Sequence, residues 1–302
     1  MHIPDGFLSM RVCLVMGAIS APSVTYAARK AQTELQESRV PLLGAMGAFV
    51  FAAQMVNFPV GVGTTGHLVG GALLAFTLGP AASIVIMTAI LAVQALVFQD
   101  GGVLALGANV FNMALAGVLA GYLPYYFFGH SSRKKVAIFL GAALSVLTSG
   151  TLALTELIIS GVQVPQKALY VPLGLFSVNA ILEGAITVAV IRSLEAFNPC
   201  WLKKPTPRVG SVVTVLIAAS VILAAGGFLV ASTYPDTLER FIERLSFTQG
   251  KGNQWVAPLA GYNAHFLRDA WLQKVAAGLV GLAILYVLCV VIGKLALKRR
   301  RG

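Results

Sequence analysis

Long apolar blocks separated by short polar segments run through the whole chain. Most blocks are about 20 residues long, the length at which a helix crosses a bilayer. The strict alternation of apolar and polar positions that is typical of membrane β-barrels is absent. We therefore expect an all-α, polytopic membrane helical bundle. The predicted spans are 7–27, 41–57, 68–79, 80–98, 104–128, 136–160, 171–192, 210–232 and 271–293.

The third predicted span is short and ends in Gly79-Pro80. Proline cannot continue a helix without a break, so this pair predicts either a tight reversal between two helices or a break within one helix. The two alternatives differ in the number of membrane crossings, and the sequence pattern leaves both open.

Composition supports the assignment to the membrane. Hydrophobic residues make up 57% of the chain and charged residues only 11%, against about a quarter charged in a typical soluble domain. A net charge of +11 would suggest nucleic acid as a partner of a soluble protein, but in a membrane protein it must be interpreted by location. The three cysteines have unrelated spacings, so we expect neither a disulfide framework nor a thiolate metal site.

The basic residues predict the orientation. With nine spans, 15 of the 22 Lys and Arg residues fall on one side, in the segments around 29–39, 133–135, 192–208 and 294–301. Short cytoplasmic loops collect Lys and Arg, so we predict a cytoplasmic C-terminus and an extracytoplasmic N-terminus in the inner or plasma membrane. The basic rim then faces anionic membrane lipid rather than nucleic acid.

A linker divides the chain. The stretch "NPCWLKKPTPRVG", residues 198–210, combines three prolines with basic residues between two apolar blocks. We expect a seven-helix domain over residues 1–197, a cytoplasmic linker over 198–209, and a helical hairpin with an extracytoplasmic loop over 210–302.

Two of the four histidines stand out from the pattern. His130 and His265 lie in polar loops and are expected to be solvated. His67 follows "VGTTG" at the start of a glycine-rich apolar span, on the same predicted side as the N-terminus. Ionisable groups at such depth are often functional, but helix ends also tolerate them, so both interpretations stay open for His67 alone.

The amino-terminal stretch "MHIPDGFLS" fits none of the criteria for a signal peptide, so we expect Met1 to carry a free α-amine. The amine, the amide nitrogen of His2 and the His2 imidazole can close two fused chelate rings around one metal. Three nitrogens in a plane leave one corner of a square, and square-planar nitrogen coordination favours Ni(II) or Cu(II), with low-spin Co(II) also possible. The alternative is that "MHIPDG" only begins an amphipathic segment.

An extended part of the sequence is similar to a known family. "MHIPDGFLS", the stretch 61–122 that begins "GVGTTGHLVGG", and "ILEGAITVAVI" at 181–191 resemble the substrate-binding M subunit of energy-coupling-factor transporters for nickel and cobalt. The resemblance implies a seven-helix bundle that binds the metal through Met1, His2 and His67.

The later segment "YPDTLERFIER", residues 234–244, resembles the Pro-Asp-Gly-Leu-Glu signature of the small N subunit of the same systems. Thr237 stands where that signature has glycine, and no residue role is transferred from it. The resemblance implies a fused two-helix accessory part that is needed for metal loading or transport.

Other polar residues are candidates for orienting His67 or neutralising a bound ion. They are Thr64, Thr65, Gln94, Asp100, Asn109 and Asn112. The alternative for each is helix capping or a hydrogen bond to loop backbone. Glu156 and Glu183 lie within predicted spans, where a hydroxyl or backbone partner is the first expectation.

The sequence thus predicts a transport component rather than an enzyme. It lacks a Walker A string, so it does not hydrolyse ATP itself, and the resemblance implies a transmembrane coupling subunit and two cytoplasmic ATPases as partners. We expect the chain to bind Ni(II), or Co(II), on the outside as the transported ion and to release it inward. The order of intrinsic affinities favours nickel. The alternatives are a proton-driven secondary transporter, with Glu156 and Glu183 as the relay, and a membrane metal sensor that does not transport.

Overall fold

The computed structural model describes residues 1–198, 209–245 and 256–301. These residues are predominantly helical, with one short hairpin of two strands, which confirms the predicted all-α membrane bundle. The helices are α1 (Met10–Glu34), α2 (Val40–Gln54), α3 (Gly71–Leu78), α4 (Pro80–Val93), α5 (Leu106–Asn109), α6 (Gly117–Phe128), α7 (Lys134–Ile159), α8 (Tyr170–Phe197), α9 (Val209–Gly226), α10 (Thr237–Arg244) and α11 (Ala270–Arg301). The strands are β1 (Phe58–Gly61) and β2 (Thr64–Gly66).

Within the described residues, seven helices are long and apolar enough to cross a membrane. The sequence predicted nine spans, and two of them are wrong in length. The predicted span 41–57 is the 15-residue helix α2, because the chain leaves the helix after Gln54 for the β1–β2 hairpin. The predicted span 68–79 is the eight-residue helix α3, which begins only at Gly71. The protein is a multi-pass membrane protein whose described residues also form the shorter helices α2, α3 and α10.

The segment from 68 to 98 is a reversal rather than a kinked helix. Gly79 joins α3 to α4 with φ +81°, a left-handed conformation that glycine adopts without a steric penalty. The side chain of Gln54 contacts both arms of the turn: its Nε2 donates to Val69 O at 2.7 Å and lies 3.9 Å from Met87 Sδ. Residues before α3 and midway along α4 therefore lie side by side, and α4 continues as a π-helical turn, Gln94–Phe98.

Helix α2 lies at the centre of the bundle, where it packs against α9, α11 and α4. Almost every residue of α2 is buried. Two of its glycines allow α11 to approach closely: a Cβ at Gly44 would lie 2.8 Å from Val290, and one at Gly47 would lie 2.8 Å from Cys289. Small residues at such contacts are the usual means by which membrane helices pack tightly. The C-terminal helices are therefore packed into the bundle.

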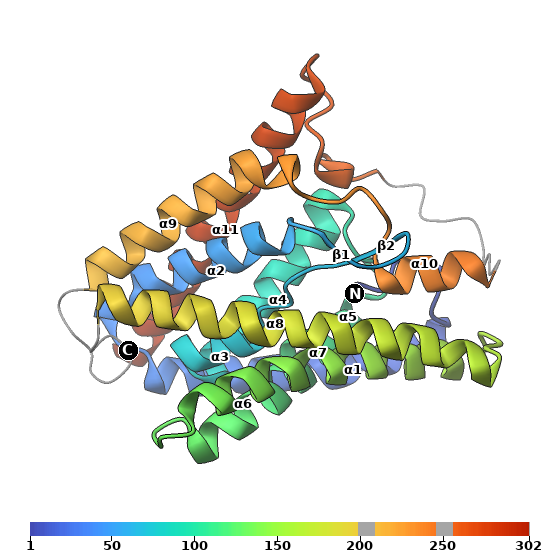
Figure 1. The fold of residues 1–302 in the computed structure, drawn as a ribbon. Helices are drawn as coiled ribbons and strands as arrows, with labels where there is room; N and C mark the ends of the chain where they lie inside the picture. The colour runs from blue at the N-terminus through green and yellow to red at the C-terminus, as the bar shows by residue number, and fades with distance from the viewer. Residues whose placement is uncertain (199–208, 246–255, 302) are drawn as a thin grey trace.

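The two ends of the bundle differ in structure. One end carries the N-terminus, the β1–β2 hairpin and α10, and the C-terminus lies at the opposite end (Figure 1). An ion pair between Lys134 and Glu195 joins the start of α7 to the last turn of α8. This end of the bundle is the one that the topology predicts to be cytoplasmic. The predicted linker falls almost entirely at residues 199–208, which include Cys200, Lys203 and Lys204 and lie outside the described residues.

Candidate metal centre

The first five residues, Met1–Asp5, form a segment that we call the amino-terminal arm, in which Pro4 and Asp5 are partly exposed. Met1 and His2 are each 5% exposed and Ile3 is fully buried. Asn109, at the end of α5, holds Ile3 like a neighbouring strand: Ile3 N donates to Asn109 Oδ1 at 2.8 Å, and Asn109 Nδ2 donates to Ile3 O at 3.1 Å. Gly102 N also donates to Ile3 O at 2.9 Å. The arm is thus fixed inside the bundle by its own backbone.

Asp5 is the last residue of the arm and fixes its end farthest from the amine. Its carboxylate accepts from the backbone N–H groups of Val103 at 3.0 Å and Leu104 at 2.8 Å, in the loop that precedes α5. These donors satisfy a charged side chain that would otherwise be costly to bury. Asp5 and Asn109 together determine how far the chain end reaches into the bundle.

The α-amine of Met1 meets His67, which follows β2. The amine lies 2.9 Å from His67 Nε2, and the other ring nitrogen, Nδ1, lies 2.9 Å from Leu68 O. A hydrogen bond from Nδ1–H to the carbonyl leaves the lone pair of Nε2 free to face the amine. Burial, followed by the positive charges of the amine and of His2, lowers the pKa of His67 to about 3. The imidazole is therefore neutral at neutral pH, the form that binds metals.

His2 lies beside His67 with its ring parallel to the His67 ring. The ring centroids are 5.5 Å apart and the planes differ by 3°. His2 Nδ1 lies 3.2 Å from Asp100 Oδ1, whereas Nε2 is buried and has no hydrogen-bond partner. Burial alone would raise the pKa of Asp100, but the neighbouring His2 outweighs it, and the net effect is a lowered pKa. Tyr262 also donates to Asp100, at 2.5 Å.

Buried polar side chains from the helices hold the loop that carries His67. Glu183 on α8 accepts from Val69 N and Gly70 N, both at 2.8 Å, so both of its oxygens are bound to backbone. This agrees with the expectation of a structural partner for Glu183. Gln94 reaches the loop only indirectly, because its Nε2 donates to Gln54 Oε1 at 2.8 Å and Gln54 in turn binds Val69.

Thr64 and Thr65 pair with a segment from the C-terminal part of the chain, Tyr234–Thr237, which we call the closing segment. Thr65 N donates to Pro235 O at 3.0 Å, and Thr65 Oγ1 donates to Tyr234 O at 3.0 Å. Thr237 Oγ1 returns a bond to Thr65 O at 3.3 Å. Two segments about 170 residues apart in the sequence are therefore paired directly before His67.

Asp236, in the closing segment, forms an ion pair with the α-amine of Met1. Burial would raise the pKa of Asp236, but the amine charge outweighs it and the pKa is lowered. Sequence reasoning noted the surrounding motif but assigned no role to Asp236. The available signal was the spacing of Asp236 and Glu239, which is typical of a helix start, and Asp236 caps α10 in the structure. Nothing in the pattern placed that helix start beside Met1.

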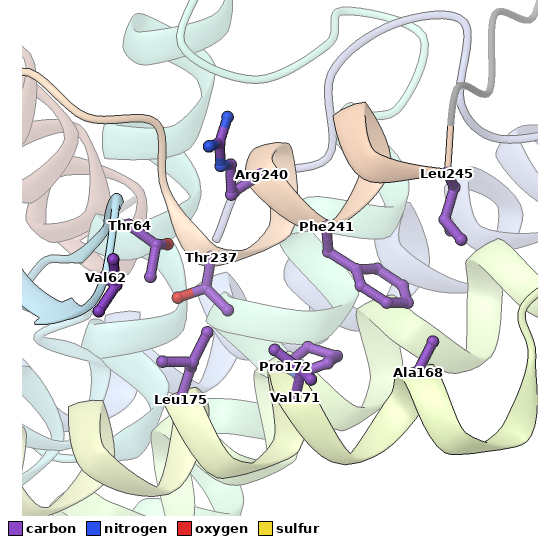
Figure 2. A pocket seen from close by; sticks show the side chains of 10 residues that line it. All are labelled: Val62, Thr64, Ala168, Val171, Pro172, Leu175, Thr237, Arg240, Phe241 and Leu245. Atoms are coloured by element: carbon purple, nitrogen blue, oxygen red, sulfur yellow. The ribbon is translucent and has the colours of Figure 1, made fainter.

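A cavity of about 370 Å³ lies next to the closing segment. Figure 2 shows α10 above α8, with the side chains of Phe241 and Leu245 directed toward α8 and with Thr64 and Thr237 at one end of the cavity. The lining is mostly apolar, so this cavity offers no ligand set for a cation.

The remaining candidates lie elsewhere. His130 and His265 are exposed, as expected from the sequence. Asn112 Nδ2 donates to Glu156 Oε2 at 2.8 Å within the bundle, away from the arm's contacts. In the part of the chain that the structure describes, no group of three or more His, Cys, Asp and Glu side chains is arranged to hold a metal ion. Metal binding at His2 and His67 would therefore depend on main-chain nitrogen.

Comparisons with known proteins match both parts of the chain. Residues 2–201 match the family described as cobalt uptake substrate-specific transmembrane region, and residues 210–298 match the PDGLE domain. The chain is 27% identical to the fused nickel transport protein NikMN of Rhodobacter capsulatus, over the full length of both. It is 37% identical to the cobalt transport protein CbiM of Thermosediminibacter oceani, covering 65% of this chain and 84% of that protein. A crystal structure of a truncated transition metal transporter is 34% identical, with a TM-score of 0.58 over 65% of this chain and 99% of the other.

Proposed function

The chain belongs to the cobalt uptake substrate-specific transmembrane region family, and from that premise we propose that it is the metal-specificity component of an ATP-driven energy-coupling-factor importer. Its relatives show that the protein is a nickel or cobalt transport component of the membrane and not an enzyme. We further propose which atoms bind the ion, which ion is preferred, in which direction it is transported and what supplies the energy.

The observation that carries the proposal is the 2.9 Å separation between the Met1 amine and His67 Nε2. With metal–nitrogen bonds of about 2.0–2.1 Å, adjacent corners of a square of nitrogen donors lie about 2.9 Å apart. The amine and His67 thus already have the spacing of two neighbouring ligands. The amide nitrogen and Nδ1 of His2 supply the other two corners, which requires Nδ1 to exchange Asp100 for the ion.

Nickel is the ion that we propose, because square-planar nitrogen coordination and the order of divalent affinities both favour Ni(II) over Co(II). When the ion binds, the amine and the His2 amide each release one proton to solvent, and the proton that His2 Nδ1 directs at Asp100 must pass to Nε2 of the same ring or to solvent. Neutral His67 needs to release none. Asp100 is then placed to neutralise part of the charge of the ion, and Asn109 to keep the arm in register.

Energy and direction follow from the partners that we propose. A transmembrane coupling subunit and two cytoplasmic ATPases would drive the release of the ion inward, since the chain has no Walker A string of its own. Two features support an extracytoplasmic binding site. Most basic residues fall in the segments predicted to be cytoplasmic, and the arm lies at the end of the bundle opposite the C-terminus (Figure 1).

The ligand assignment is tested by measuring Ni(II) binding to the purified full-length chain whose N-terminal mass has been determined. We expect His2→Ala, His67→Ala and a short extension before Met1 each to abolish tight binding. The loss should exceed the about 10- to 100-fold effect that is typical of residues that only support a ligand. His130→Ala and His265→Ala are matched controls, because both histidines are exposed, and they should bind as the parent does. Tight binding by the extended protein would contradict the amine as a ligand.

The energy source is tested separately by uptake into vesicles. We expect nickel accumulation only when the chain is reconstituted with the coupling subunit, the ATPases and ATP. Uptake by the chain alone, driven by a proton gradient, would contradict the coupling-factor proposal and favour a secondary transporter.

A further inference from the structure

We propose that Asp236 is a positioning residue of the metal site, which holds the Met1 amine against His67. The C-terminal part of the chain would thus complete a site whose ligands all lie within the first 67 residues. This inference rests on the proposed function, because it assumes that the amine is a ligand.

The first observation is the ion pair itself. The carboxylate of Asp236 faces the amine of Met1, and both groups are largely buried, with side-chain exposures of 13% and 3%. A buried charge is strongly unfavourable unless it is paired. The amine and the carboxylate therefore fix each other in place, whereas the arm's other backbone contacts begin only at Ile3.

The second observation is that Asp236 is itself rigidly placed. Its Oδ1 accepts from Glu239 N at 2.8 Å and caps the N-terminus of α10, while Glu239 Oε2 accepts from Asp236 N at 3.2 Å. Leu238 and Phe241 of α10 are buried, and Figure 2 shows the side chain of Phe241 directed toward α8. One oxygen thus anchors the residue to its helix, and the other, Oδ2, is directed at the amine.

The third observation is the pairing of the closing segment with β2. Thr65 binds the backbone of Tyr234 and Pro235, directly before Asp236, and Thr65 is only two residues from His67. The segment that carries the carboxylate is therefore tied to the strand that carries the histidine. This connection fixes the amine and Nε2 relative to each other, although Met1 and His67 are 66 residues apart in the sequence.

The charge of Asp236 remains paired when the ion binds. In the metal-free site the carboxylate faces an ammonium group. In the bound site the amine has released its proton, and the carboxylate faces the divalent ion that the amine coordinates. Asp236 therefore has a cation opposite it in both states, and its effect on affinity comes from ordering the free chain end in advance, which reduces the entropy lost on binding.

The test uses the full chain and the variant Asp236→Asn. Asparagine caps helices about as well as aspartate, so α10 keeps its N-cap while the negative charge at the amine is lost. Glu239→Gln is the matched control, because it removes a neighbouring carboxylate and retains a capping-box residue without touching the amine. Ni(II) affinity is measured by competition with a chelator, and the coordination geometry by the absorption band of square-planar Ni(II).

We expect Asp236→Asn to lower the Ni(II) affinity about 10- to 100-fold, the range for residues that orient a metal ligand. The square-planar band at saturation should not change, and Glu239→Gln should bind as the parent does. The metal-free Asp236→Asn protein should unfold at a lower temperature, because the buried amine loses its partner. The inference is overturned if Asp236→Asn keeps the parent affinity, if Glu239→Gln loses as much, or if the band is lost, which would make Asp236 a ligand. His67→Ala is measured alongside: if it abolishes binding while Asp236→Asn has no effect, only this inference fails and the proposed function stands.

Discussion

The amino-terminal arm is held from two sides that use different chemistry. On the bundle side, Asn109 and Asp5 exchange hydrogen bonds between side chains and backbone over residues 3–5 and 102–105. On the closing side, Asp236 forms an ion pair with the amine at the very end of the chain. The backbone and side-chain groups of residues 3–5 keep the same hydrogen-bonding character whether or not an ion is bound, but the amine must give up a proton to bind one.

This difference separates two tasks. The bundle side determines the register of the arm, and therefore which backbone nitrogen lies near His67. The closing side acts on the amine, the group that we propose as a metal ligand. Variants on the bundle side should therefore affect the position of the whole arm, and variants on the closing side should affect affinity through the amine itself.

The largest effect on stability is expected from Glu183→Ala, which removes an anchor of the His67 loop on the bundle side. The substitution leaves the buried N–H groups of Val69 and Gly70 without an acceptor, at a cost of about 1–3 kcal/mol for each. We expect the free energy of unfolding in detergent to fall by about 2–6 kcal/mol on that basis. Glu195→Ala is the control: its ion pair with Lys134 is partly exposed and should contribute about 0–1 kcal/mol. Equal unfolding of the two variants would remove Glu183 from the set of structural anchors.

A smaller effect is expected from Asn109→Ala, which removes both hydrogen bonds to the backbone of Ile3. Without them the arm can slide or leave the bundle, so Ni(II) affinity should fall about 10- to 100-fold. Asn112→Ala offers a matched control, because Asn112 is also a buried asparagine but binds Glu156 instead of the arm. If Asn112→Ala weakens Ni(II) binding as much as Asn109→Ala does, the register of the arm is not what Asn109 contributes.

The smallest effect is expected from Thr65→Val on the closing side. Valine keeps the shape of threonine and the backbone bond to Pro235, but it removes the hydroxyl bonds to Tyr234 and Pro235. A hydrogen bond of this kind contributes about 0.5–1.5 kcal/mol, so Ni(II) affinity should fall about 2- to 10-fold. Thr64→Val should change it less, since the hydroxyl of Thr64 lies 3.5 Å from its acceptor. An unchanged affinity in Thr65→Val would indicate that backbone pairing alone holds the closing segment.

Much of the fold could be predicted because membrane insertion depends on local composition. Apolar blocks of sufficient length became α1, α4 with its π-helical turn, the α5–α6 region, α7, α8, α9 and α11. The two errors in length lie beside the site. Gly and Pro around β1 and β2 favour a turn, and the chain uses residues 55–70 to place His67 rather than to extend a helix. Hydropathy averaged over a window does not distinguish a buried loop from a helix end.

The residues of the candidate site were also predicted only in part. Asp100 and Asn109 were selected as polar residues near the predicted outer face, and the structure places both in contact with the arm. Gln94 was selected for the same reason, but it reaches the His67 loop only through Gln54. Thr64 and Thr65 were expected to hold the loop before His67, and they hold the closing segment against it. Their roles in metal binding stay predictions until affinities are measured.

The sequence by itself determined the membrane bundle and the chelating potential of Met1 and His2. Both follow from neighbours in the chain: hydropathy over about 20 residues favours a membrane helix, and adjacent backbone and imidazole nitrogens lie within reach of one ion through covalent geometry. Only the tertiary structure decided which distant groups meet at the chain end. Asp236 lies 235 residues from the amine it pairs with, and α10 is held near the arm by its contacts with β2 and α8, while α9 and α11 pack on α2. Long-range contacts of this kind depend on the packing of whole helices, which no local pattern specifies.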